Sequence, residues 1–234
     1  KNESDKIIQK EILLMVQKNP LLKVELIKAK KNLGLRKSIE NGLKKLSKKF
    51  NFSIIFEDDC IPRKEFFKFI KLNLNNLNSK KFAAICGYLY SPLHKKFLRR
   101  KKTFTLQFEN FCPWGYCINL NVWSNYQMNK KIIKENNPLN NSLLSKIKSI
   151  TNNKKVWTLD FMTFCKIKKY RFLYPSRSLV KNIGFDGTGQ NSKLTDKFNI
   201  EYYKSEVSKS LTSFSKNLNK THENYLKKNI KYFY

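Results

Sequence analysis

Three consecutive carboxylates, Glu57, Asp58 and Asp59, are the residues of this sequence best suited to carry chemistry. They follow the apolar stretch Ser53–Phe56, which predicts a short buried strand, and they precede Pro62, which cannot continue one. Like charges at this spacing repel each other, so a positive partner must offset them. At the carboxyl end of a strand in an α/β sheet, where ligands usually bind, a divalent cation carrying phosphates is the natural candidate.

A polar turn at residues 31–38 precedes the carboxylates and leads into a helix with one apolar face. Residues 22–29, before the turn, alternate enough to predict a strand. Strand, helix and the strand at 53–56 would form a parallel unit with a right-handed crossover. The turn and the carboxylates would then open onto the same edge of the sheet.

Three later segments could also contribute to a site. Phe111–Cys117 is an aromatic turn that contains glycine, and residues 157–167 predict a helix with Asp160 near its first turn. A carboxylate at that position is equally explained by the helix dipole. Residues 178–191 form a loop with three glycines, which could move as a lid or could be a surface turn.

Hydrophobic periodicity predicts an α/β chain in which helices and strands alternate. Beyond the segments already named, we expect helices at 5–18, 64–74, 119–127 and 143–150, strands at 82–88, 103–108 and 171–175, a basic loop at 91–102, and polar helices near 203–218 and 221–231. The chain is long enough for one sizeable core. We expect one domain at residues 1–200 and a basic, helical extension at 201–234.

The composition is strongly basic, since 48 lysines and arginines oppose 17 acidic residues and give a net charge of +31. Such an excess indicates an anionic partner, such as nucleic acid, a phosphorylated substrate or an acidic membrane surface. Lysine is nevertheless spread along almost the whole chain together with abundant Asn, Ile and Phe, as a low-GC coding bias would produce. The aromatic residues lie in apolar segments rather than between lysines, so we rank a nucleic-acid-binding protein below an enzyme.

The five cysteines are odd in number and lie inside apolar runs, which indicates free core thiols in a reducing compartment. His94 and His222 are the two histidines, and no cysteine and histidine set completes a zinc site. The sequence shows neither a signal-peptide pattern nor an apolar run of about 18 residues. We expect a cytoplasmic protein whose basic surface could contact anionic lipid at the inner membrane face.

Five segments occur in the order and approximate spacing typical of nucleotide-sugar glycosyltransferases with a GT-A fold; they are Lys31–Ser38, Glu57–Asp59, Pro113–Cys117, Asp160 and Asn182–Gly189. The sequence resembles the family that includes N-acetylglucosaminyltransferase I and its bacterial sugar-transferase relatives, from the first helix to about residue 200. This resemblance implies a three-layer α/β sandwich with a mixed, mostly parallel sheet. Relatives begin with a strand and helix that cradle the nucleotide base, and we expect this chain to lack them.

The resemblance also implies which residues contact the donor. Asn32, Gly34 and Lys37 match a turn that lies near the donor nucleotide in the family. Trp114 and Gly115 match an aromatic turn that shapes the pocket for the donor sugar. These roles belong to the family and are carried over only at the matching positions.

The acidic triplet matches the family letter for letter. By that resemblance Asp59 coordinates Mn²⁺ or Mg²⁺, and Glu57 and Asp58 contact the ribose or the sugar. Asp160 matches the catalytic base. The chemistry agrees, because a hard cation stabilises charge that builds on a diphosphate leaving group and a base removes the proton of the acceptor hydroxyl, a contribution of about 10²–10⁴-fold. One base opposite the leaving group implies single displacement with inversion.

The segment Gly184–Gly189, including Asp186 and Gly187, matches the mobile loop that closes over the donor. The resemblance therefore implies a metal-dependent, inverting enzyme that moves a sugar from a nucleoside-diphosphate sugar to a glycan or lipid-linked acceptor. Bacterial relatives commonly build surface polysaccharide. Two alternatives remain open, namely a transferase-like module that binds a partner without chemistry and a basic nucleic-acid-binding protein.

Overall fold

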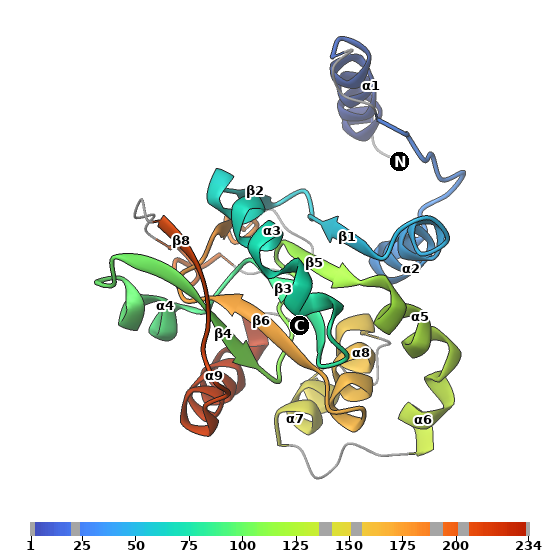
Figure 1. Ribbon diagram of the computed structural model, residues 1–234. Coiled ribbons are helices and arrows are strands. Elements are labelled where there is room, and N and C mark those ends of the chain that lie inside the picture. Colours follow the sequence, from blue (N-terminus) through green and yellow to red (C-terminus); the bar gives the residue numbers. More distant parts are fainter. Residues whose placement is uncertain are drawn as a thin grey trace. The chain divides into compact units, whose positions relative to one another are not determined.

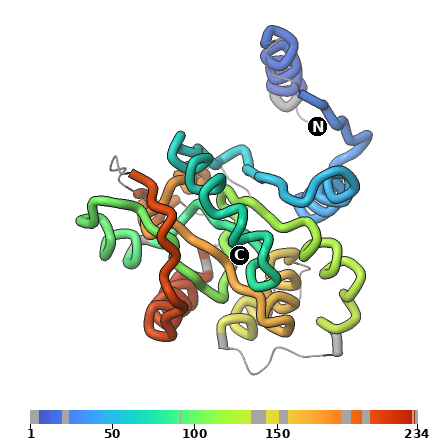
Figure 2. Tube along the Cα trace, in the orientation of Figure 1, coloured from blue at the N-terminus to red at the C-terminus, as the bar shows by residue number. Residues whose placement is uncertain are grey.

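The computed structural model describes residues 3–19, 24–135, 142–150, 156–187, 194–200 and 206–232. The chain forms two compact units, Lys1–Lys37 and Ser38–Tyr234, and each is described by itself (Figure 1). Figure 2 follows the trace from the first unit, in blue, to the C-terminal segment, in red.

The first unit contains α1 (Glu3–Gln17), which confirms the helix expected at 5–18. Residues 24–29 have no regular secondary structure, so the strand expected at 22–29 is wrong over these positions; residues 22 and 23 lie outside the described part of the chain. The side chains at 24–29 are exposed, and a short alternating pattern does not by itself provide a partner for the backbone. The parallel unit expected around α2 (Gly34–Leu46) is therefore not formed.

The second unit is built on a six-stranded mixed sheet, which confirms the α/β class. The spatial order of its strands is β1-β5-β3-β6-β4-β8. The strands are β1 (Phe52–Ile55), β3 (Phe82–Cys86), β4 (Lys102–Phe108), β5 (Tyr116–Asn119), β6 (Arg171–Pro175) and β8 (Glu206–Leu211). Only the pairs β3–β6 and β4–β8 are parallel, and the other neighbours are antiparallel. The described sheet is thus mixed without being mostly parallel.

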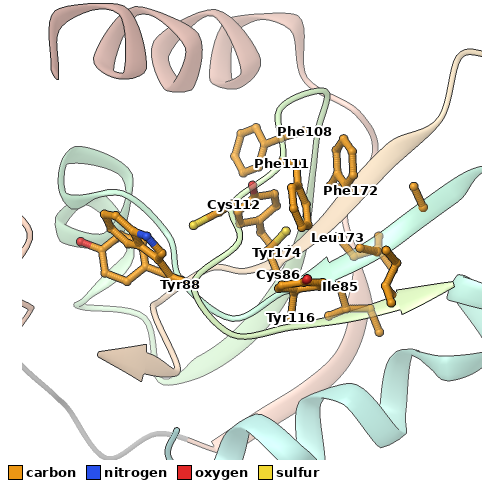
Figure 3. Close-up of a cluster of buried hydrophobic side chains, with 14 of the residues drawn as sticks. Ile85, Cys86, Tyr88, Phe108, Phe111, Cys112, Tyr116, Phe172, Leu173 and Tyr174 are labelled. Carbon is orange, nitrogen blue, oxygen red and sulfur yellow. The ribbon is translucent and has the colours of Figure 1, made fainter. Parts of the chain in front are cut away.

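Side chains that alternate along β4 contact two helices, which therefore lie on opposite faces of the sheet. Thr105 Oγ1 donates to Asn73 Oδ1 of α3 (Lys64–Asn78) at 3.1 Å. Phe108, three residues further and therefore on the other face, packs against His222 of α9 (Lys216–Asn229) with ring centroids 4.4 Å apart. Figure 3 shows part of the buried hydrophobic cluster to which Phe108 belongs. Helix α9 therefore covers one face of the sheet and α3 covers the other, and α3 also contributes buried aromatic residues to the core.

The remaining helices of the second unit are α4 (Ser91–Phe97), α5 (Leu120–Met128), α6 (Lys130–Glu135), α7 (Ser142–Ile150), α8 (Trp157–Ile167) and a 3₁₀ turn at Ile230–Tyr232. The helix expected at 157–167 and the strand expected at 171–175 have the predicted bounds. Among the described helices, none is both long and apolar enough to cross a bilayer. The five cysteines are free and buried, as expected for core thiols.

Three local predictions were wrong for identifiable reasons. Residues 91–97 of the expected basic loop form α4, whose first turn contains Pro92, a residue preorganised for that place. Residues 206–211, expected to be helical, form β8 because the edge of β4 provides a parallel partner for a polar segment. Residues 116 and 117, expected to belong to the aromatic turn, begin strand β5 (Tyr116–Asn119), because the turn at 111–115 brings the chain between β1 and β3. Segment 201–234 thus contributes a strand as well as a helix.

Candidate functional site

The acidic turn, defined as Glu57–Cys60, follows β1 and is closed by a hydrogen bond from Cys60 N to Glu57 O at 3.0 Å. Strands β1 and β3 are both antiparallel to β5, and β6 is parallel to β3, so β1, β3 and β6 run in the same direction. Their carboxyl ends meet at one edge of the sheet, which we call the ligand edge. Gly87–Tyr90 and Ser176–Leu179 follow the other two strands at this edge. The carboxylates thus lie at a strand end, as the sequence suggested.

A separate two-stranded ladder orients Asp59. Strand β2 (Cys60–Pro62) pairs antiparallel with β7 (Val180–Asn182). Asn182 Nδ2 donates to Asp59 Oδ2 at 3.1 Å, and Asn182 Oδ1 accepts a hydrogen bond from Gly184 N at 2.8 Å. One amide side chain therefore joins the carboxylate to the glycine-containing loop.

Gly184 lies directly against Asp59, and a Cβ at this position would overlap Asp59 Oδ2. The backbone is tied in the same place, because Ile183 N donates to Asp59 O at 2.9 Å. The second carboxylate oxygen of Asp59 accepts a hydrogen bond from Cys60 Sγ at 3.4 Å. Each oxygen has two lone pairs, so Asp59 keeps acceptor capacity for a ligand.

The expected mobile loop is described only as far as Gly187, and residues 188–193 lie outside the described part of the chain. Phe185 is buried and packs edge-on against Trp114, with ring centroids 5.2 Å apart. Asp186 and Gly187 are exposed, and Gly187 has a φ of +90° that disfavours other residues. The first part of the loop is thus anchored to the aromatic turn.

Trp114 and Gly115 do lie at the ligand edge. Trp114 is 8 % exposed and packs against Tyr88 with ring centroids 4.8 Å apart. Gly115 has a φ of +66°, and Gly115 O accepts a hydrogen bond from Gly87 N at 2.7 Å. A Cβ on Gly87 or Gly115 would clash with Val180, so glycine allows β7 to approach this closely.

Glu57 is the most perturbed acid of the acidic turn. Burial, with the neighbouring charges of Asp59 and Asp58, raises the pKa of Glu57 to about 7. Burial and then the charge of Glu57 raise the pKa of Tyr116 well above its ordinary value. The Tyr116 hydroxyl is buried and has no hydrogen-bond partner among the described residues. The turn therefore gathers acidic groups beside a buried hydroxyl that has no described hydrogen-bond partner.

Asp160 lies in the first turn of α8 and is partly buried. Trp157, which begins this helix, packs against Phe111 at 5.7 Å and Tyr116 at 6.3 Å between ring centroids. Between Trp157 and Cys165, Asp160 is the one side chain that is not buried. It is thus the acid of α8 that keeps some access to solvent, and its role as the catalytic base stays a prediction.

Asn32, Gly34 and Lys37 belong to the first unit and are exposed. Asn32 Oδ1 accepts a hydrogen bond from Gly34 N at 2.8 Å, and Gly34 has a φ of +71°. These contacts form the turn before α2 that the sequence predicted. Their proposed role toward the nucleotide stays a prediction.

The described residues contain no group of three or more His, Cys, Asp and Glu side chains placed to hold a metal by themselves. A Mg²⁺-type site needs fewer protein ligands, since one or two carboxylates usually act with substrate phosphates and water. Asp59 fits this role, because its remaining lone pairs and the two adjacent carboxylates supply hard oxygen ligands. The chemistry of the acidic turn therefore agrees with a cation that arrives with a phosphorylated ligand.

Sequence reasoning did not identify the partner of Asp59 or the buried cation at the ligand edge. Asn182 is separated from Asp59 by 123 positions, and the contact depends on the pairing of β2 with β7. Arg177 is buried between two serines, and a lone arginine in an apolar stretch was the only available signal. No protein-family profile matches this sequence, and no curated protein resembles it significantly.

Proposed function

We propose that this protein is a glycosyltransferase of the GT-A type that moves a sugar from a nucleoside-diphosphate sugar to an acceptor hydroxyl. The observation that carries the proposal is Asp59, held by Asn182 and by the backbone of Ile183 beside two further carboxylates at the ligand edge. A negative cluster that the fold orients without neutralising suits a cation bound together with phosphates. The resemblance of five ordered sequence segments to this class supports the same assignment.

In the proposed mechanism the acidic turn binds the metal ion and the donor, and α8 provides the base. Asp59, oriented by Asn182, would hold Mn²⁺ or Mg²⁺, which when bound supplies positive charge to the diphosphate leaving group. Glu57 and Asp58 contact the hydroxyls of the ribose or of the donor sugar. Asp160 accepts the proton of the acceptor hydroxyl, and attack from the side opposite the diphosphate inverts the configuration at the transferred carbon. Trp114 limits water near the sugar because its ring closes one side of the aromatic turn.

A nucleotide-sugar hydrolysis panel with UDP- and GDP-sugars and Mn²⁺ tests the proposal. We expect hydrolysis of at least one donor, which Asp59→Ala abolishes. Glu206→Gln is the matched control, because Glu206 is an exposed acid paired with Lys102 at 3.2 Å on β8. If no donor is hydrolysed, or if Asp59→Ala and Glu206→Gln behave alike, this function is rejected.

Two alternatives give different outcomes in a thermal-shift assay. A transferase-like module without chemistry would show no hydrolysis and, if it binds no donor, no stabilisation by UDP or GDP with Mn²⁺. A nucleic-acid-binding protein, suggested by the net charge of +31, would bind oligonucleotides with an affinity that falls steeply as salt rises. The glycosyltransferase proposal instead expects a nucleotide shift that requires Mn²⁺ and Asp59.

A further inference from the structure

Arg177, directly after β6 at the ligand edge, is a buried cation. The residue is 4 % exposed. Its Nε and Nη2 atoms are inaccessible to solvent and have no hydrogen-bond partner among the described residues. Arginine stays protonated in proteins, so the cation cannot escape this environment by losing its proton.

The backbone around Arg177 is held firmly, so its burial is not the result of a loose loop. Ser178 N donates to His94 Nδ1 at 3.0 Å, and Ser178 Oγ donates to Leu89 O at 2.7 Å. On the other side, Ser176 Oγ accepts a hydrogen bond from Phe104 N at 3.1 Å. The two serines bind the ends of neighbouring elements and fix the position of the arginine between them.

The two described segments that lie beside Arg177 in the fold and in the sequence carry no acidic residue. Residues 88–108, which include α4 and β4, have no Asp or Glu, and neither have residues 171–185. Instead α4 and the turn after it carry further cations, which are Lys95, Lys96, Arg99, Arg100 and Lys101. We call Arg177 together with residues 94–101 the basic corner. Within the sheet, β1, which precedes the acidic turn, and β6, which precedes Arg177, are three strand positions apart, on the order of 14 Å.

We propose that Arg177 anchors a subsite for a phosphate group of the acceptor substrate. The guanidinium offers two parallel N–H groups that match two oxygens of a phosphate, and the neighbouring cations favour a doubly charged group. We assign this phosphate to the acceptor because Asp59 and Arg177 follow strands that are not neighbours in the sheet. This assignment to the acceptor rests on the proposed glycosyltransferase function.

The test is titration of inorganic phosphate into the full chain, followed by thermal denaturation and calorimetry. We expect phosphate to stabilise the wild-type protein. Arg177→Met should melt at a higher temperature without phosphate, because it removes an uncompensated buried charge, and should lose the phosphate-dependent shift. Arg177→Lys keeps the charge without the paired N–H groups, so we expect about tenfold weaker phosphate binding. Lys68→Met, which removes an exposed charge of α3 outside the basic corner, is the matched control and should keep the shift.

The outcomes separate this inference from the proposed function. An unchanged phosphate shift in Arg177→Met, or no shift in the wild-type protein, overturns the subsite. UDP or GDP with Mn²⁺ should bind Arg177→Met as tightly as wild type and should not compete with phosphate. Competition would place the donor diphosphate at Arg177 and would overturn the assignment to the acceptor. Nucleotide binding without phosphate binding leaves the proposed function intact and rejects only the subsite.

Discussion

The acidic turn and the basic corner lie along the same edge of the sheet and carry charges of opposite sign. They differ in the hydrogen bonds that the protein makes to the charged groups. Asp59 accepts hydrogen bonds from Asn182 and Cys60, so its carboxylate is oriented before any ligand binds. Arg177 is desolvated and makes no such bond with a described residue. Orientation without neutralisation suits a group that must meet a metal ion and phosphate at fixed geometry. Desolvation alone suits a group that only needs to attract and hold an anion.

The largest expected effect is on the rate of sugar transfer, which depends on the proposed base Asp160. Asp160→Asn should lower sugar transfer by about 10²–10⁴-fold, because the acceptor hydroxyl loses its base. Donor binding, measured by calorimetry with UDP or GDP and Mn²⁺, should not change. Transfer at the wild-type rate in a variant that still binds donor would remove Asp160 from the mechanism and leave the acidic turn as a binding site only.

The pH dependence of stability tests how strained the acidic turn is without a ligand. Glu57 has a folded pKa raised from 4.5 to about 7, so its contribution is fully present below pH 4.5 and is lost as the pH rises through 7. At pH 8 the loss reaches about 3 kcal/mol. Glu57→Gln should abolish this dependence and stabilise the protein at pH 8 in urea unfolding. A variant curve parallel to that of the wild-type protein would show that Glu57 is not strained.

Gly184 tests whether orientation of Asp59 matters for binding. Gly184→Val should displace the Asp59 carboxylate, lower the free energy of unfolding by about 1–3 kcal/mol and weaken Mn²⁺-dependent nucleotide binding. Gly42→Ala is the control, because nothing lies within 4 Å of a Cβ at this helical position. This change should stabilise the protein by about 0.5–1 kcal/mol without altering binding. Equal nucleotide affinity in the two variants would contradict the proposed role of Gly184.

The pH dependence that His222 gives to stability has the sign opposite to that of Glu57. Its ring is fully buried against Phe108, and burial lowers its pKa from 6.5 to about 3. The unfolded chain therefore binds the proton first, and stability falls as the pH drops from 6.5 towards 3, by about 2 kcal/mol at pH 5. His222→Phe should remove this dependence. Between pH 4.5 and 6.5 the slopes of Glu57 and His222 oppose each other, so wild-type stability should change little and each single variant should reveal one slope.

The local hydrophobic pattern of the sequence predicted those helices and strands whose own side chains are buried. The helix at Trp157–Ile167 and the strand at Arg171–Pro175 have the expected bounds because their side chains alone identify the buried face. Strand β8 was missed because its side chains are mostly exposed and polar, and its structure depends on the edge of β4. The strand expected at 22–29 shows the reverse case, in which a pattern exists but residues 24–29 find no partner.

The same distinction applies to the candidate site. The sequence predicted where the carboxylates lie but did not predict the contacts of Asp59 and Arg177. The carboxylates were predicted to lie at the carboxyl end of β1, because an apolar strand followed by three acids is a local feature of the sequence. The orientation of Asp59 depends on Asn182, and the burial of Arg177 depends on three elements brought together by β6. Neither contact leaves a periodic signal in the sequence. Charge and glycine content indicated where ligands could bind, while pairwise geometry required the folded chain.

The hydrogen bond between Asp59 and Asn182 has a consequence for folding order. It joins positions separated by 123 residues, so it forms only after a long loop closes, and such contacts are slow to form. During synthesis the acidic turn leaves the ribosome long before β7 exists. A nascent chain that ends before Asn182 therefore carries all three acids without their oriented carboxylate, and the capacity to bind ligand should appear abruptly once β7 pairs with β2.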